Sequence, residues 1–233
     1  FIEPADYIVI GANGLVDPQT WTLLGERLAD VDRRYVMPGF YGRDAEGHVR
    51  TFSRGGSDVS GAVAARAANA MLYENWTDVS GLLMADPRIV DKPKPMEEVT
   101  YSEIRELSYM GASVLHEEAM APVREVGIPV NIRNTNEPGH PGTRIVAELS
   151  AEEVASTQIA GVAGKTTFAM ITVGKNLMNR EVGFVYRLLG VFEHHGITFE
   201  HCPSSIDSVS VIVEAKWLEG RVEQVLDEIR RTM

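Results

Sequence analysis

The chain has 233 residues, of which 44% are hydrophobic and 24% are charged, as is ordinary for a globular protein. Its 33 acidic side chains outnumber 22 lysines and arginines, which gives a formal net charge of -11. This charge argues against nucleic acid and against an anionic membrane as partners, because both attract clustered cations. No stretch is apolar for long enough to span a membrane. The single cysteine, Cys202, excludes an intrachain disulfide and fits a reducing cytoplasm.

The first 150 residues alternate predicted strands and helices, which is typical of an α/β layer structure. Apolar segments predict strands at 7–10, 35–40, 74–77 and 129–133. Helices are expected from Asp17-Pro18 onward and over 59–71, 101–109 and 115–126. Prolines make 85–97 an irregular connection, and 134–142 is expected to be a polar loop.

A second domain is expected beyond a boundary near residues 150–157. Its predicted order is strand 167–173, helix 181–195, strand 197–202, strand 208–214 and helix 219–232. This βαββα order is a ferredoxin-like unit without its last strand. Because a missing strand leaves an open sheet edge, the second domain is expected to be incomplete.

The strongest local signal is the segment Ser53–Asp58, Ser-Arg-Gly-Gly-Ser-Asp, which runs into a predicted helix. Adjacent glycines allow a ligand to approach the backbone, and the helix N-terminus together with Arg54 attracts an anion. The alternative is a structural turn in which Ser57 or Asp58 caps the helix. The pattern alone leaves both interpretations open. It is no Walker-type phosphate loop, because no Gly-Lys-Ser/Thr follows.

A second signal lies at the end of the strand predicted over 74–77. Thr77 and Asp78 stand where open α/β sheets hold nucleotides, and Asp78 has a carboxylate suited to ribose or Mg²⁺. Arg88 is a candidate for neutralising phosphates. The alternative is a capping aspartate and a solvated arginine.

The six histidines show no spacing that enforces a metal site, so no metal ligand is predicted. The adjacent pair His194 and His195 is interpreted as the end of a helix, where the dipole favours such residues. His116 and Cys202 are interpreted as packed side chains.

Several motifs together resemble the aspartate kinase family. They are the segments Phe52–Asp58, Trp76–Gly81, Asp86–Arg88, Gly111–His116 and Pro129–Asn134, the last followed by Gly142–Ile145. They are similar to the C-terminal half of the catalytic domain, and the chain from about Ile159 onward resembles the ACT regulatory domain. The resemblance implies an amino-acid-kinase-type three-layer αβα sheet over residues 1–150. It also implies a ferredoxin-like βαββα(β) ACT domain, incomplete, over residues 157–233.

The resemblance further implies ATP-dependent phosphorylation of L-aspartate to 4-phospho-L-aspartate, the first step toward lysine, threonine and methionine. It also assigns a role to each matching residue. On the aspartate side, Arg54 pairs with the carboxylate, and Gly55, Gly56 and Ser57 line that pocket. On the nucleotide side, Asp58 supports the Mg²⁺-phosphate region, Thr77 and Asp78 contact ATP, and Arg88 contacts the phosphates. Ser113 stands where many members have a lysine, so this cation is not carried over.

The resemblance also implies feedback regulation through an effector amino acid held between two ACT units, and therefore a homodimer. The expected effector residues are Met178, Glu181, Phe199, Glu200 and Ser205, with Glu200 or Asp207 accepting an ammonium group. Lysine is the favoured effector and threonine stays open. The alternative is that these acids are ordinary surface residues.

The Lys-Phe-Gly-Gly motif with which the family begins is absent from this chain. The chain is therefore expected to be a fragment that is inactive alone. One alternative is a non-catalytic amino-acid-sensing ACT module. Another is a kinase of the same fold that acts on glutamate, carbamate or a nucleotide.

Overall fold

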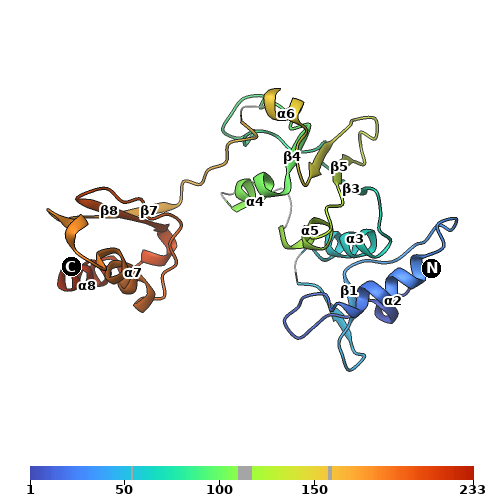
Figure 1. Ribbon diagram of the computed structural model, residues 1–233, viewed down its shortest axis with the longest axis horizontal. Coiled ribbons are helices and arrows are strands. Elements are labelled where there is room, and N and C mark those ends of the chain that lie inside the picture. Colours follow the sequence, from blue (N-terminus) through green and yellow to red (C-terminus); the bar gives the residue numbers. More distant parts are fainter. Residues whose placement is uncertain (54, 110–116, 157–158) are drawn as a thin grey trace. The chain divides into compact units, whose positions relative to one another are not determined.

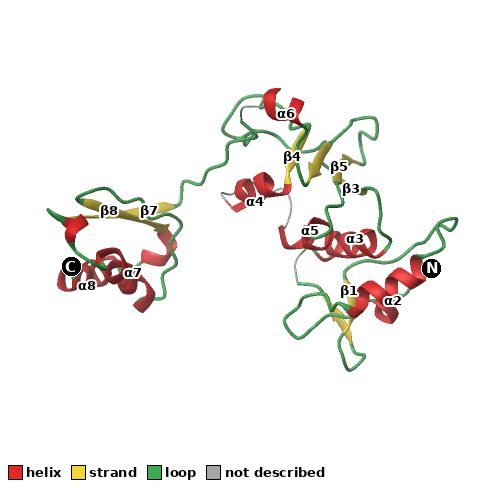
Figure 2. Ribbon diagram, in the orientation of Figure 1, coloured by secondary structure: helices red, strands yellow, loops and turns green. Residues whose placement is uncertain are grey.

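The computed structural model describes residues 1–53, 55–109, 117–156 and 159–233. Its helices and strands confirm a mixed α/β protein (Figures 1 and 2). The chain divides into two compact units, Phe1–Gly164 and Lys165–Met233. Three residues named above, Arg54, Ser113 and His116, lie outside the described residues. None of the described helices has the length and apolar character needed to cross a membrane.

The first unit begins with two helices and a hairpin. Helices α1 (Pro4–Tyr7) and α2 (Gln19–Leu28) precede the antiparallel strands β1 (Tyr41–Arg43) and β2 (Val49–Thr51). The strand predicted at 7–10 is wrong, because Pro4 occupies a first-turn position in α1 and the following residues form only isolated bridges. The strand predicted at 35–40 is also wrong, since β1 begins only after Phe40, whose φ of 86° leaves the extended region.

A four-stranded sheet forms the centre of the first unit, with the order β3-β5-β6-β4. Strand β3 (Tyr73–Thr77) runs parallel to β5 (Val130–Asn134), which lies antiparallel to β6 (Thr143–Val146). Strand β4 (Glu98–Thr100) closes the other side, parallel to β6. The sequence predicted β3 and β5 and missed the two short strands β4 and β6.

Helices cover one face of this sheet. They are α3 (Gly56–Ala67), α4 (Tyr101–Tyr109) and α5 (Glu117–Arg124), which contribute buried residues to a core shared with the strands. The opposite face is polar, with the ion pairs Arg133–Glu74 at 3.0 Å and Arg144–Glu98 at 2.9 Å. Helix α6 (Ala151–Ser156) follows β6.

The second unit pairs two strands with two helices. Strand β7 (Phe168–Gly174) lies antiparallel to β8 (Ser208–Glu214), and their core includes residues of α7 (Phe184–His194) and α8 (Val222–Thr232). Figure 1 shows both helices on the same side of the strand pair. The strand predicted at 197–202 is wrong as a continuous element, because the segment meets β8 only through an isolated bridge at His201.

Candidate active site

The turn into α3 places two glycines at the start of that helix. Gly55 is the N-cap residue, with a φ of 63° in the left-handed region, and it makes no side-chain cap hydrogen bond. The structural alternative in which Ser57 or Asp58 is the N-cap is therefore wrong. A Cβ atom at Gly56 would lie 2.9 Å from the Phe40 ring, so the helix begins in close contact with the preceding chain. Free amide groups at a helix start are suited to an anion.

Ser60 holds this turn in place. Its hydroxyl donates to the Gly56 carbonyl oxygen at 2.8 Å and accepts a hydrogen bond from the Phe40 amide at the same distance. Ser60 is buried, so both hydrogen bonds are protected from water. The exposed Ser57 lies one turn earlier on the same helix.

Asp58 reaches from α3 to strand β3. Its Oδ1 accepts a hydrogen bond from Asn75 Nδ2 at 2.9 Å, and the same amide lies 3.1 Å from the Tyr73 phenol. The Tyr73 hydroxyl in turn donates to the Asp58 carbonyl oxygen at 3.3 Å. Burial, with a smaller contribution from the Asp58 charge, raises the pKa of Tyr73 to about 12, so this phenol remains a hydrogen-bond donor. The network fixes one carboxylate oxygen at the helix–sheet junction.

Thr77 and Asp78 lie where β3 ends, beside the loop after β5. The amide and hydroxyl of Thr135 donate to the Thr77 carbonyl oxygen at 2.8 and 2.9 Å. The Thr77 hydroxyl lies 3.3 Å from the exposed Asp78 carboxylate. Thr77 stands two residues after Asn75 on the same face of β3, so the strand connects the start of α3 with this sheet edge.

Polar residues that were not predicted join the loop after β3 to the loop after β5. Asn134 is 7% exposed and donates to the Ser80 hydroxyl at 2.7 Å, and Ser80 donates to Glu137 at 2.7 Å. Asn75 and Asn134 share one signal, a polar side chain at a core-facing position of its strand, where it is at most 8% exposed. That signal could have identified them from sequence.

Arg88 lies on the surface and pairs with Asp86. Its side chain is 84% exposed, and its guanidinium contacts both carboxylate oxygens at 2.6–3.1 Å. Hydrogen bonds from Arg88 lower the pKa of the Asp86 carboxyl to about 2, so the pair stays ionised at neutral pH. The segment 85–97 around this pair forms no helix or strand, as predicted, and a backbone hydrogen bond of 2.8 Å joins Met96 to Leu82.

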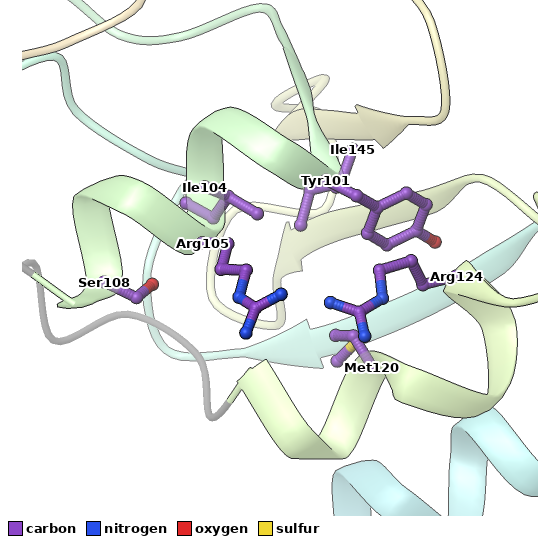
Figure 3. Close-up of a pocket in the computed structure, with 7 residues that line it drawn as sticks. All are labelled: Tyr101, Ile104, Arg105, Ser108, Met120, Arg124 and Ile145. Atoms are coloured by element: carbon purple, nitrogen blue, oxygen red, sulfur yellow. The ribbon is translucent and has the colours of Figure 1, made fainter.

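Described residues of the first unit line at least two cavities. The larger, about 440 Å³, has the dimensions of a small-molecule pocket. Phe52 and Ser53 line it just before the glycine turn, and Arg66 from α3 stacks 4.1 Å from the Trp21 ring. The smaller, about 20 Å³, has room for about one water molecule. Figure 3 shows the Arg105 and Arg124 guanidinium groups pointing into it from α4 and α5.

The residues expected to bind an effector are spread around the second unit. Met178 is 5% exposed in its core, while Phe199 is 45% exposed. Glu181 pairs with Lys175 at 2.7 Å and with Arg187, and the Lys175 hydrogen bond lowers the pKa of the Glu181 carboxyl.

Backbone hydrogen bonds attach the chain segment 200–207 to strand β8. The Glu200 amide donates to Ile212 at 2.8 Å and the Ser205 amide to Ser208 at 2.7 Å. Asp207 accepts from the Leu177 amide at 2.8 Å. Among these acids, Glu181 and Asp207 therefore already have partners within the protein.

Comparison with known proteins supplies the family. The model of the amino acid kinase family matches residues 2–134. Aspartokinase 3 of Bacillus subtilis is 43% identical over 212 residues, which cover 91% of this chain and 46% of that protein. Lysine-sensitive aspartokinase 3 of Escherichia coli is 28% identical over 179 residues, covering 77% of this chain and 39% of that protein.

A solved structure extends the likeness over the whole chain. The crystal structure of Clostridium acetobutylicum aspartate kinase is 46% identical with a TM-score of 0.86, and the match covers 100% of this chain and 53% of that one. This chain thus spans about half the length of the curated relatives it matches. The resemblance seen in the motifs is confirmed, and because the family model covers more than half of the 233 residues, the chain belongs to the amino acid kinase family.

Proposed function

We propose that the protein is an aspartate kinase, which phosphorylates the side-chain carboxylate of L-aspartate with ATP to give 4-phospho-L-aspartate. This reaction begins the synthesis of lysine, threonine and methionine. The observation that carries the proposal is the junction of α3 and β3, where Asp58 in the first turn of α3 accepts a hydrogen bond at 2.9 Å from Asn75, two residues before Thr77 ends β3. The kinase names of the relatives support it.

The residues have complementary roles in this proposal. A carboxylate oxygen of aspartate attacks the γ-phosphorus of ATP, and the bond to the bridging oxygen breaks as ADP leaves. Arg54 pairs with the aspartate, and Gly55, Gly56 and Ser57 line its pocket with helix amides. Thr77 and Asp78 hold the nucleotide at the strand end. Such a site acts by positioning and by neutralising charge.

Mg²⁺ is proposed as the metal that accompanies ATP and neutralises its phosphates. The chain offers the oxygen ligands that this ion prefers, in the carboxylates of Asp58 and Asp78. Among the described residues, the hydrogen bond to the Asp58 carboxylate comes from Asn75 at 2.9 Å and engages Oδ1, so the donor set fits. These residues would hold the ion, while Asn75 keeps the Asp58 carboxylate oriented.

Residues 157–233, which contain the second unit, are proposed to form an ACT regulatory domain of the ferredoxin-like βαββα(β) class, in which the strand at 197–202 is reduced to an isolated bridge at His201. Residues 1–150 are proposed to form the three-layer αβα catalytic part. Lysine is the proposed effector, supported by the lysine-sensitive relative, and Glu200 is the acid proposed to receive its ammonium group. A homodimer through this domain would cover exposed apolar residues such as Val182 and Tyr186, which are 94% and 83% exposed. The single cysteine supports a cytoplasmic location.

A chimera tests the proposed function. The matching 212 residues of Bacillus subtilis aspartokinase 3 are replaced by the corresponding segment of this chain. We expect release of ADP that depends on aspartate, measured by a coupled assay. A chimera that is folded by circular dichroism but has no aspartate-dependent turnover would contradict the proposal. Glutamate or carbamate accepted in place of aspartate would instead indicate another kinase of this family.

Arg88→Gln in the chimera is expected to raise the KM for ATP about tenfold, because a charged contact to phosphate is lost. Thermal stability should not change, since Arg88 is 84% exposed. Arg33→Gln is the matched control, because Arg33 also pairs with an aspartate on the surface, at 2.8 Å, and should leave the KM unchanged. If both variants have the same KM for ATP, Arg88 does not contact the nucleotide.

A further inference from the structure

A cluster of three potential metal ligands joins the two helices of the second unit, far along the chain from the kinase motifs. His194 ends α7, His195 follows it, and Glu228 lies in α8. His194 Nδ1 is 2.8 Å from Glu228 Oε1, and His195 Nε2 is 3.0 Å from Glu228 Oε2. One atom from each of the three residues can be chosen so that all lie within 4.8 Å of one another.

These distances approach those of a coordinated ion. Ligand atoms at about 2.0–2.1 Å from a tetrahedral zinc ion lie about 3.4 Å apart. The two nitrogen–oxygen pairs, at 2.8 and 3.0 Å to different oxygens of Glu228, would open by a few tenths of an ångström, and the remaining ligand atoms, which lie within 4.8 Å of one another, would close by up to about 1.4 Å. Side-chain rotation can supply this change without moving the helices.

The donor set selects the class of ion. Two imidazole nitrogens with one carboxylate suit Zn²⁺, Ni²⁺, Co²⁺ and Cu²⁺. Mg²⁺ and Ca²⁺ prefer shells made of oxygen, so they do not fit these ligands. We propose that His194, His195 and Glu228 bind one divalent transition-metal ion of the zinc class and thereby clamp the end of α7 to α8.

The surrounding structure holds the ligands in place. Val191 and Phe192 anchor the end of α7 in the core, and Val225 and Ile229 anchor α8 beside Glu228, all at 5% exposure or less. Arg221 ties the two helices together by donating to the His195 carbonyl oxygen at 3.1 Å. Preorganised ligands of this kind lose little freedom when an ion binds.

The three side chains of the cluster differ in their exposure to solvent. The side chains of His195 and Glu228 are 17% and 25% exposed, whereas that of His194 is 72% exposed. An ion can therefore enter beside His194, and water can fill a fourth position. The two rings lie 5.4 Å apart and are tilted by 44°, so both can direct a nitrogen at one ion.

Titration of the whole chain with ZnCl₂ tests the site. The protein is prepared without a histidine tag and stripped of metals with a chelator, and binding is followed by calorimetry. We expect one Zn²⁺ ion per chain, with binding weakened at least tenfold in Glu228→Gln and in the double variant His194→Ala/His195→Ala. His48→Gln is the matched control, because His48 also faces a carboxylate, that of Asp44, at 3.4 Å. It should bind Zn²⁺ like the unchanged protein.

Two results would overturn the proposal. One is the absence of saturable Zn²⁺ binding to the unchanged chain, or Zn²⁺ binding by the site variants as tight as by the unchanged chain while circular dichroism shows the variants folded. The other is coordination of Zn²⁺ by atoms of other residues. Long-range ¹H–¹⁵N spectra should show Zn²⁺ at Nδ1 of His194 and Nε2 of His195, and shifts confined to other histidines would indicate an adventitious surface site.

Discussion

Replacing Asp58 with asparagine is expected to lower the kcat of the chimera by about 10²–10³-fold, the usual effect of losing one electrostatic group from an active site. Asparagine can still accept the hydrogen bond that Asn75 Nδ2 donates at 2.9 Å, so the junction of α3 and β3 should remain packed. The negative charge alone is removed. The measurement is the rate of ADP release at saturating ATP and aspartate.

Asp32→Asn is the control for this variant, because Asp32 is an exposed aspartate in the turn after α2 and should tolerate the change. A chimera that keeps most of its turnover after Asp58→Asn would place the proposed Mg²⁺-phosphate region elsewhere.

Asn75→Ala separates the positioning of Asp58 from its charge. Asn75 is 8% exposed and orients the Asp58 carboxylate, so its removal should lower kcat less than Asp58→Asn does. The double variant should be no slower than Asp58→Asn alone, since Asn75 is proposed to act through that charge. If the fold losses of kcat in the two single variants multiply in the double variant, Asn75 has a role independent of Asp58.

Gly142→Ala is expected to destabilise the first unit by about 3–5 kcal/mol, which is at the upper end for a single substitution. Gly142 has a φ of +79°, a conformation that costs alanine energy. A Cβ atom there would also collide with the Ile132 carbonyl oxygen on the neighbouring strand and lie 3.0 Å from Asn131 Oδ1. Ile132 belongs to β5 and Gly142 directly precedes β6, the two central strands of the sheet, so neither can move freely.

Gly139→Ala provides a control three residues earlier in the same loop. Nothing lies within 4 Å of a Cβ atom at Gly139, and its φ is not positive, so stability should stay within about 0.5 kcal/mol of the original. Urea unfolding in a Trp217→Phe background isolates the first unit, because the remaining tryptophans, Trp21 and Trp76, both belong to it. Equal unfolding midpoints for the two glycine variants would contradict the steric argument.

Much of the fold follows from local sequence. Strand β3 and helices α3, α7 and α8 were predicted because an apolar segment or a helical pattern extends over their length. Strands β4 and β6 were missed because they have only three and four residues, too few to show a period. The segment at 7–10 has strand-like residues, but a strand requires a partner along its length, and here only isolated bridges form.

The candidate sites likewise have a part that adjacent residues predict and a part that only the folded chain brings together. The sequence alone identified the glycine turn and named Asp58 as a candidate, since both depend on residues adjacent in the chain, and it determined the family through motifs in a fixed order. Only the tertiary structure joined Asp58 to Asn75, 17 residues away, and brought Glu228 to His194 across 34 residues. Hydrogen bonds and metal ligation act over a few ångströms in space. Which distant residues come that close is decided by the packing of helices and strands.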